Sequence, residues 1–363
     1  MQTSARLIFP DGSTFHGKVF AGSQDRTGEV VFNTAMAGYQ EVLTDPSYSG
    51  QIVVMTYPLI GNYGIHEADW ESKGLHLEAL LIKEYCDFPS HFASQKTLKA
   101  YLDEHHILGL EGFDTRAITR YVRDNGAQRA WATTSDDSIE DLLNRLKSLP
   151  SMVGSNLADK VTTSQPYVWQ VLPNPKFKVA VIDCGIKFNI LRILTSLGCE
   201  CEVFPTSVSA QTILNKGFNG VFVSNGPGDP EPLTHVVDSL KTLLGKLPVF
   251  GICLGHQLMG LAFGGKTYKL KFGHHGVNHP VKNLRTQKVE ITSQNHGFCV
   301  DMATLNSEEV EVTHVNLNDH TVEGIRHKRF PAFAVQYHPE AAPGPEDPTY
   351  LFHDFIAMMK GQY

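Results

Sequence analysis

The chain has 363 residues, of which 42% are hydrophobic and 19% are charged, and its formal net charge is -7. This balance excludes the basic face of a nucleic-acid-binding protein, and no apolar run reaches the roughly 18 residues of a membrane helix. The length predicts two domains, and six scattered cysteines without a disulfide framework indicate a reducing cytoplasm.

The first half of the chain begins with strand-like residues and not with a secretion signal, since residues 1–13 lack a charged segment followed by an apolar one. Runs of β-branched and aromatic residues bounded by Gly, Pro and Asp predict strands at 7–9, 14–20, 28–32 and 51–57. Capping residues and apolar periodicity predict helices at 94–105, 115–124 and 138–149. Residues 1–150 are therefore expected to form a mixed α/β domain.

The composition changes after residue 150. Prolines at 166, 173 and 175, with Ser and Thr around them, predict a linker at 151–175. In residues 176–363, apolar strands alternate with helices; the first strands are expected at 178–183, 201–205 and 220–224, and the helices between them at 189–197 and 210–216. This alternation predicts a largely parallel sheet flanked by helices, with ligands bound at the carboxyl ends of the strands.

The clearest chemical signal is Gly-Ile-Cys-Leu-Gly at 251–255, which follows an apolar strand and precedes a predicted helix at 256–263. A nucleophile on so tight a strand-to-helix turn requires small residues two positions before and after it, and Gly251 and Gly255 satisfy this. Cys253 is therefore a candidate nucleophile. The alternative is a buried structural cysteine in an ordinary turn.

A nucleophilic thiol needs a base, and the base needs an orienting group. Near the end of the chain, an apolar strand at 333–337 leads into His338-Pro339-Glu340. Glu340 lies two residues after His338, on the same side of an extended chain, where its carboxylate can hold one ring nitrogen while the other faces the thiol. Among 17 histidines, His338 is the best candidate base.

These motifs resemble the class I glutamine amidotransferases, which carry Gly-Ile-Cys-Leu-Gly-His-Gln, here at 251–257, and Gln-Tyr-His-Pro-Glu, here at 336–340. Ser-Asn-Gly-Pro-Gly-Asp-Pro at 224–230 resembles the oxyanion loop of that family. The resemblance implies that Cys253 attacks the side-chain amide of glutamine and forms a glutamyl thioester, while His338 transfers the proton and Glu340 orients it. The N–H of Leu254 and one from the loop at 226–228 would hold the oxyanion.

Three sequence motifs in the first half of the chain, at 38–48, 57–64 and 112–119, indicate which kind of amidotransferase the chain resembles. They resemble the N-terminal domain of carbamoyl-phosphate synthetase small subunits, as do 272–280 and 293–298, so the resemblance runs from about Leu7 to Phe355. The chain departs from that pattern at Val277, where a second glycine is common, and at Trp131, which is usually aliphatic.

The family resemblance implies a partner and a substrate site. The partner is a large synthetase subunit, which would carry ATP, bicarbonate and magnesium and make carbamoyl phosphate for arginine and pyrimidine synthesis, so that no cofactor is expected on this chain. Residues 1–150 would serve for docking that subunit. The implied glutamine-binding residues are Ser47, Gly226, Gly228, Leu254, Gln257, Asn295, Gly297 and Phe298. Ser47 would have to reach this site from the other domain.

Three other interpretations compete with this one. His275 and His279 have the spacing of two zinc ligands on a helix, with His274 beside them, but Gly273, Gly276 and Pro280 oppose a helix there, so we expect no metal. A stand-alone hydrolase such as a γ-glutamyl peptidase would have no use for so large a first domain. A regulatory subunit with an idle triad would not need to keep Cys253, His338 and Glu340.

Overall fold

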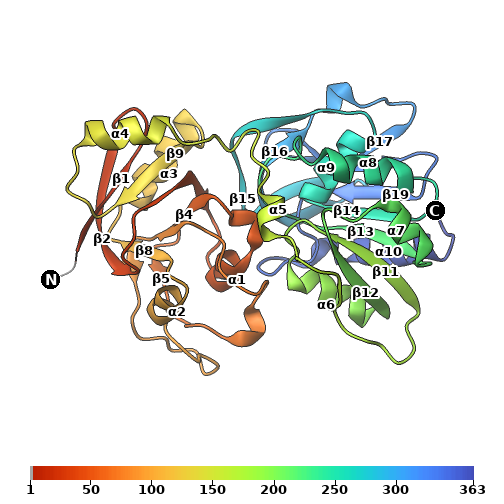
Figure 1. Ribbon diagram of the computed structural model, residues 1–363, viewed down its shortest axis with the longest axis horizontal. Helices are drawn as coiled ribbons and strands as arrows, with labels where there is room; N and C mark the ends of the chain where they lie inside the picture. Colours follow the sequence, from red (N-terminus) through yellow and green to blue (C-terminus); the bar gives the residue numbers. More distant parts are fainter. Residues whose placement is uncertain (1–2) are drawn as a thin grey trace. The chain divides into compact units, whose positions relative to one another are not determined.

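The computed structural model describes residues 3–363, which form two compact units (Figure 1). The first unit runs to Ser155 and also includes Lys271–His275, while the second contains Asn156–Leu270 and Gly276–Tyr363. The segment that we predicted as a linker, 151–175, contains a short helix and a short strand, and the strand pairs within the sheet of the second unit.

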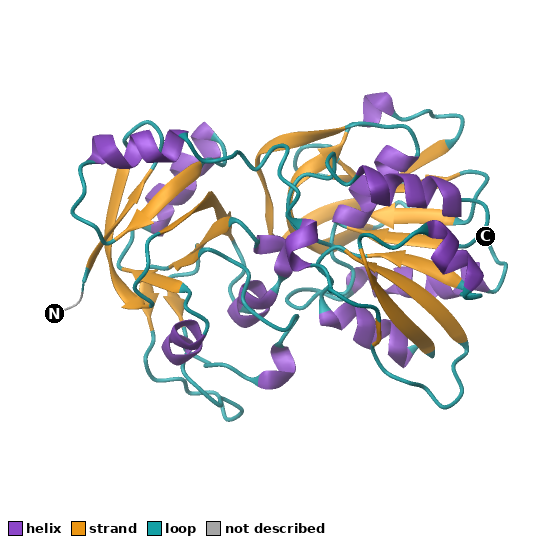
Figure 2. Cartoon of the chain, viewed as in Figure 1, coloured by secondary structure: helices purple, strands orange, loops and turns teal. Residues whose placement is uncertain are grey.

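The first unit is built around a closed barrel in the strand order β1-β2-β8-β6-β4-β3-β9 (Figure 2). Its strands are β1 (Ser4–Ile8), β2 (Thr14–Ala21), β3 (Arg26–Asn33), β4 (Gln51–Met55), β6 (Ala79–Leu81), β8 (Leu108–Glu111) and β9 (Arg129–Thr133), with a separate parallel pair β5 (Leu59–Ile60) and β7 (Glu84–Tyr85). Its helices are α1 (Tyr39–Thr44), η1 (Pro46–Tyr48), η2 (Glu67–Asp69), α2 (Leu98–Glu104), α3 (Thr115–Asn125) and α4 (Ile139–Lys147). The mixed α/β domain that the sequence predicts is confirmed, and the closure of its sheet is the new feature.

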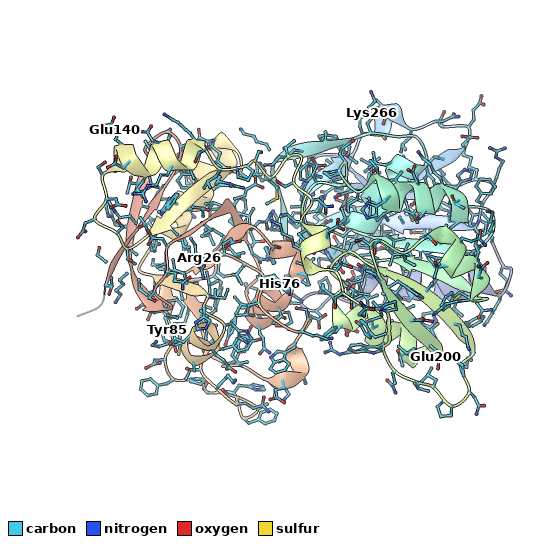
Figure 3. The ribbon with its side chains drawn as sticks, viewed as in Figure 1. Arg26, His76, Tyr85, Glu140, Glu200 and Lys266 are labelled. Carbon is cyan, nitrogen blue, oxygen red and sulfur yellow. The ribbon has the colours of Figure 1, made fainter. Side chains whose placement is uncertain are left out.

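Side-chain caps fix where the helices of this unit begin. Thr97 accepts a hydrogen bond from the N–H of Ala100, so α2 begins at Leu98 and not at residue 94 as predicted. Asp114 caps α3 in the same way, and Ser138 caps α4. Aromatic stacking holds the short strand β7 to the barrel: the ring of Tyr85, labelled in Figure 3, stacks on Phe20 of β2 with 4.6 Å between centroids.

The second unit contains a ten-stranded sheet in the order β10-β12-β11-β13-β14-β19-β18-β17-β15-β16. Its strands are β10 (Tyr167–Val168), β11 (Phe177–Asp183), β12 (Cys199–Pro205), β13 (Gly220–Val223), β14 (Val249–Ile252), β15 (Thr267–Asn283), β16 (Val289–Val300), β17 (Val310–Asn316), β18 (Val322–His327) and β19 (Ala332–Val335). Its helices are α5 (Ala158–Val161), α6 (Phe188–Ser196), α7 (Ala210–Asn215), α8 (Thr234–Leu243), α9 (Leu254–Ala262), η3 (Met302–Thr304), η4 (Asp347–Thr349) and α10 (Tyr350–Met359). The strands from β12 to β19 pair in parallel and β18, β17 and β15 follow antiparallel, so the predicted largely parallel sheet is confirmed.

Helices cover both faces of this sheet because alternate strand residues are apolar on both sides (Figure 2). Val221 and Val249 pack with α7, α8 and α9 on one face, while Phe222 and Phe250 pack with α6 and α10 on the other. The carboxyl ends of β13, β14 and β19 therefore open onto the loops in which the sequence motifs lie. Among residues 3–363, no helix has the length and hydropathy that crossing a bilayer requires.

Candidate active site

Cys253 lies at the bend between β14 and α9, in the left-handed region of backbone space with φ 56° and ψ -105°. A Cβ atom on Gly251 would lie 2.8 Å from the carbonyl oxygen of Gly255, and one on Gly255 would lie 2.3 Å from that of Val223. Because neither position has room for a side chain, the bend can be this tight only with glycine at both. The strand, turn and helix predicted around Cys253 are all present.

Sheet pairing brings His338 to the same end of the sheet as Cys253. β14 and β19 are parallel neighbours, with Ile252 opposite Val335, and the N–H of Cys253 donates to the carbonyl of Val335 at 2.9 Å. The chain then continues from β19 to His338, whose N–H donates to the carbonyl of Ser293 at 2.9 Å. Two motifs 85 residues apart in sequence thus meet at adjacent strand ends.

His338 and Glu340 form a buried pair. Nδ1 of His338 lies 2.6 Å from Oε1 of Glu340, and their side chains are 2% and 0% exposed. Burial alone would lower the pKa of the imidazole, but the charge of the Glu340 carboxylate, followed by interaction with the Cys253 sulfur, outweighs burial and raises the pKa above its usual value. Nε2 of His338 has no conventional hydrogen bond among the described residues, so the atom is available to a reacting group.

A buried lysine completes this group, and the sequence did not reveal it. Lys187, at the start of α6, places Nζ 3.0 Å from Oε1 of Glu340 and donates to the carbonyl of Ala341 at 2.5 Å. Burial would raise the pKa of Glu340, but the Lys187 ammonium, followed by His338, lowers it. Asn189 adds a hydrogen bond from its side-chain amide to the Glu340 carbonyl at 2.5 Å.

The backbone after Glu340 is strained. Ala341 and Ala342 both have positive φ, at 55° and 52°, which residues with a Cβ rarely adopt. Lys187 donates to the first of these residues and so helps to hold the turn. Strained backbone of this kind is concentrated at functional sites.

The loop predicted to hold an oxyanion lies against the bend at Cys253. The N–H of Gly255 donates to the carbonyl of Ser224 at 3.1 Å. A Cβ on Gly226 would lie 2.1 Å from the carbonyl oxygen of Cys184 and 2.9 Å from a methyl group of Leu254, and Gly228 has φ 88°. The Leu254 amide is the first in α9, where main-chain N–H groups have no acceptor within the helix. The loop and this amide are thus adjacent.

Among the predicted glutamine-binding residues of the second unit, Asn295 contacts the thiol directly. The Cys253 thiol donates to the carbonyl of Asn295 in β16 at 3.5 Å, and Gly297 and Phe298 follow on the same strand. Gln257 is buried in the first turn of α9, where its Nε2 donates to the Phe298 carbonyl at 2.9 Å and to Gln336 at 3.2 Å. Its Oε1 has no partner among the described residues, so this side chain offers an acceptor only.

Ser47 lies in η1 of the first unit, where its N–H donates to the Asp45 side chain at 2.9 Å. Its part in glutamine binding remains a prediction. His275 and His279 lie on β15, a strand, and not on the helix that a zinc pair at this spacing would need.

Comparisons with known proteins agree with both halves of the chain. Residues 7–132 match the family described as "Carbamoyl-phosphate synthase small chain, CPSase domain", and residues 180–358 match "Glutamine amidotransferase class-I". The chain is 50% identical to the carbamoyl phosphate synthase small chain of Syntrophotalea carbinolica, with 98% of each chain covered. It is 49% identical to that of Nitratidesulfovibrio vulgaris and 50% identical to that of Chlorobaculum tepidum, again with 98% of each chain covered.

Proposed function

Because the chain belongs to the carbamoyl phosphate synthase small chain family, we propose that it hydrolyses glutamine at Cys253 and passes the ammonia to a large, ATP-dependent synthetase subunit. The observation that carries this proposal is the placement of a strained cysteine and a buried His–Glu pair at neighbouring strand ends.

The first half-reaction forms a thioester. The Cys253 sulfur attacks the side-chain amide carbon of glutamine, and His338 takes the thiol proton. The tetrahedral oxyanion is held by the Leu254 N–H and an N–H of the loop at 226–228; one such donor typically contributes about 10²–10³ in rate. The C–N bond then breaks, the nitrogen leaves with the proton from His338, and ammonia is released.

The second half-reaction restores the thiol. Water attacks the thioester carbon while His338 removes one of its protons, the C–S bond breaks, and the proton goes to the leaving sulfur, which gives glutamate. Glu340 keeps Nδ1 of His338 protonated, so that Nε2 faces the reacting groups in both steps. Lys187 holds the Glu340 carboxylate in its ionised form.

Glutamine binding uses mostly backbone groups. Gly226, Gly228, Leu254, Gly297 and Phe298 offer main-chain contacts close to the thiol, and Asn295 adds a side chain. Since Nε2 of Gln257 is engaged internally, its free Oε1 would accept a hydrogen bond from the α-ammonium group of the substrate. Ser47, which belongs to the first unit, is the remaining predicted glutamine-binding residue.

The large subunit would supply the ATP, bicarbonate and magnesium for carbamoyl phosphate synthesis, and this chain would carry no cofactor. The carbamoyl phosphate would enter arginine and pyrimidine synthesis. The first unit would dock the large subunit, and glutamine hydrolysis by the isolated chain should be slow and rise on complex formation.

Isotope transfer tests the proposal. With [amide-¹⁵N]glutamine, ATP, bicarbonate and the large subunit, the label should appear in carbamoyl phosphate, and Cys253→Ala should abolish this transfer while leaving synthesis from added ammonia intact. A glutamine-like diazoketone should modify Cys253, as located by mass mapping. Modification at another residue, or full turnover without the large subunit, would argue for a stand-alone hydrolase.

A further inference from the structure

The second unit contains a cavity of about 600 Å³ that none of the proposed catalytic or glutamine-binding residues lines. It lies between α10, the β15–β16 turn and the β17–β18 strands, and we call it the α10 pocket. Residues that define it are Arg285, Thr313, Arg326, Phe333, Tyr350 and Asp354, with Tyr363 at its edge. Its volume is in the range of cavities that hold small organic ligands.

Two guanidinium groups reach this pocket from different elements. Arg285 lies in the turn between β15 and β16, and Arg326 lies on β18 opposite Phe333 of β19. Within residues 3–363, neither guanidinium donates a hydrogen bond to a protein acceptor or forms an ion pair. Arg326 instead stacks over the Tyr363 ring, with Cζ 3.9 Å from the centroid, an arrangement that leaves the N–H edges of the guanidinium free.

The backbone that carries Arg285 is held in place. Oδ1 of Asn283 accepts the N–H groups of Arg285 and Thr286, each at 3.0 Å, and its Nδ2 donates to the Tyr350 hydroxyl at 2.9 Å. Tyr350 in turn donates to Glu290 at 2.8 Å. The turn is thus fixed to the start of α10, which keeps its position relative to the pocket.

The charge of the pocket is positive at neutral pH. Asp354 is the acidic residue in the lining, and it faces both arginines without pairing with either. Burial, followed by the charge of Arg285, lowers the pKa of His314 in the lining to about 4, so this ring is neutral. Glu290 lies behind Tyr350 and does not line the pocket. The side chains that line the pocket thus include two positively charged arginines and one acidic residue. An anionic ligand would balance the excess positive charge.

We propose that the α10 pocket binds a small phosphate monoester, with Arg285 and Arg326 holding the phosphate and the rings of Tyr363 and Phe333 contacting the organic group. A carboxylate has two oxygens and can pair with one guanidinium group. A phosphate monoester has three free oxygens and a second negative charge, so it can pair with two guanidinium groups. The cavity has room for an organic group beyond the phosphate. The proposal is independent of glutamine hydrolysis.

Titration calorimetry of the full chain at low ionic strength, with phenyl phosphate as the probe, tests this proposal. We expect saturable 1:1 binding that Arg285→Ala and Arg326→Ala each weaken by roughly tenfold to a hundredfold. Lys288→Ala is the matched control, since it removes a positive charge from the same hairpin outside the pocket lining, and it should bind as wild type does. Asp354→Asn should tighten binding, because it removes the carboxylate that opposes the phosphate.

Three results would overturn the proposal: no saturable binding by the wild type, an affinity in either arginine variant equal to that of the wild type, or weaker binding by Asp354→Asn. Benzoate that competes as well as phenyl phosphate would overturn the assignment to phosphate. Circular dichroism and the melting temperature of each variant distinguish a lost site from a lost fold.

Discussion

Lys187 Nζ lies 3.0 Å from Oε1 of Glu340, and the two side chains are 3% and 0% exposed. The same carboxylate oxygen lies 2.6 Å from Nδ1 of His338. One buried oxygen therefore lies within hydrogen-bond distance of both the lysine ammonium and the histidine ring, and the lysine maintains the negative charge that the histidine requires. Such a carboxylate is costly to bury unless it stays paired.

Replacing Lys187 with leucine should destabilise the protein by about 3 kcal/mol, because it leaves Glu340 buried with only His338 as a charge partner. Urea denaturation measures the loss. The double variant Lys187→Leu, Glu340→Gln should regain much of the stability without regaining activity, since no unpaired charge remains. A single variant as stable as wild type would show that the ion pair contributes little.

The stability that Glu340 contributes should depend on pH. Its pKa is lowered in the folded protein, so its contribution is present above its ordinary value of 4.5 and disappears as the pH falls through the folded pKa. The pKa of His338 is raised, so its contribution is present below 6.5 and disappears as the pH rises through the folded pKa.

The free-energy difference between wild type and Glu340→Gln should therefore be largest between pH 4.5 and 6.5. Urea denaturation at about pH 3.5, 5.5 and 9 measures it. Lys288→Ala, an exposed change, provides the comparison and should show no such maximum. A difference that stays constant with pH would mean that these two groups do not titrate as a pair.

Gly255→Ala should fold poorly or lose about 3 kcal/mol, because the added Cβ would lie 2.3 Å from the Val223 carbonyl oxygen. Gly74→Ala is the matched control: nothing lies within 4 Å of the added atom, and its stability should change by about 0.5 kcal/mol or less. Thermal melting measures the stability of both variants, and Gly255→Ala should melt at the lower temperature. Equal melting temperatures would mean that the bend at Cys253 can widen.

Gly297→Ala should separate substrate binding from folding. No protein atom lies within 4 Å of the added Cβ, so the stability should match that of the Gly74→Ala control. Because Gly297 is a predicted glutamine-binding position, the methyl group should raise KM for glutamine by roughly tenfold. Steady-state kinetics with the large subunit present measures this effect, and an unchanged KM would remove Gly297 from the binding site.

The parts of the site that the sequence predicts are local in the chain. Gly251, Cys253 and Gly255 lie within five residues, and His338 and Glu340 within three, so their spacing alone indicates their relation. Lys187 could not be found in this way because it lies 153 residues from its partner Glu340. Only the pairing of strands brings the residues that follow β11 and those that follow β19 to the same edge of the sheet. In addition, a lysine just before a helix is too common to indicate a functional role.

The fold shows the same division between local and distant interactions. The strands β11 to β14 were predicted because each is rich in apolar residues and is followed by a turn or a helix. The hairpin of β15 and β16 was missed, since Gly273, Gly276 and Pro280 interrupt the strand pattern. The barrel closes through β9, which pairs with β1 and β3. Such pairings depend on residues far apart in sequence, and turn signals do not encode them.

The backbone conformation of Cys253 has a consequence for how the chain could change over evolutionary time. With φ at 56°, glycine would adopt this conformation with less backbone strain, so Cys253→Gly would relieve strain while it removes the thiol. A single codon change would then abolish catalysis and relax the backbone of the bend at the same time. A descendant that served only as a structural subunit would therefore lose its activity through one substitution, and its melting temperature would reflect that substitution.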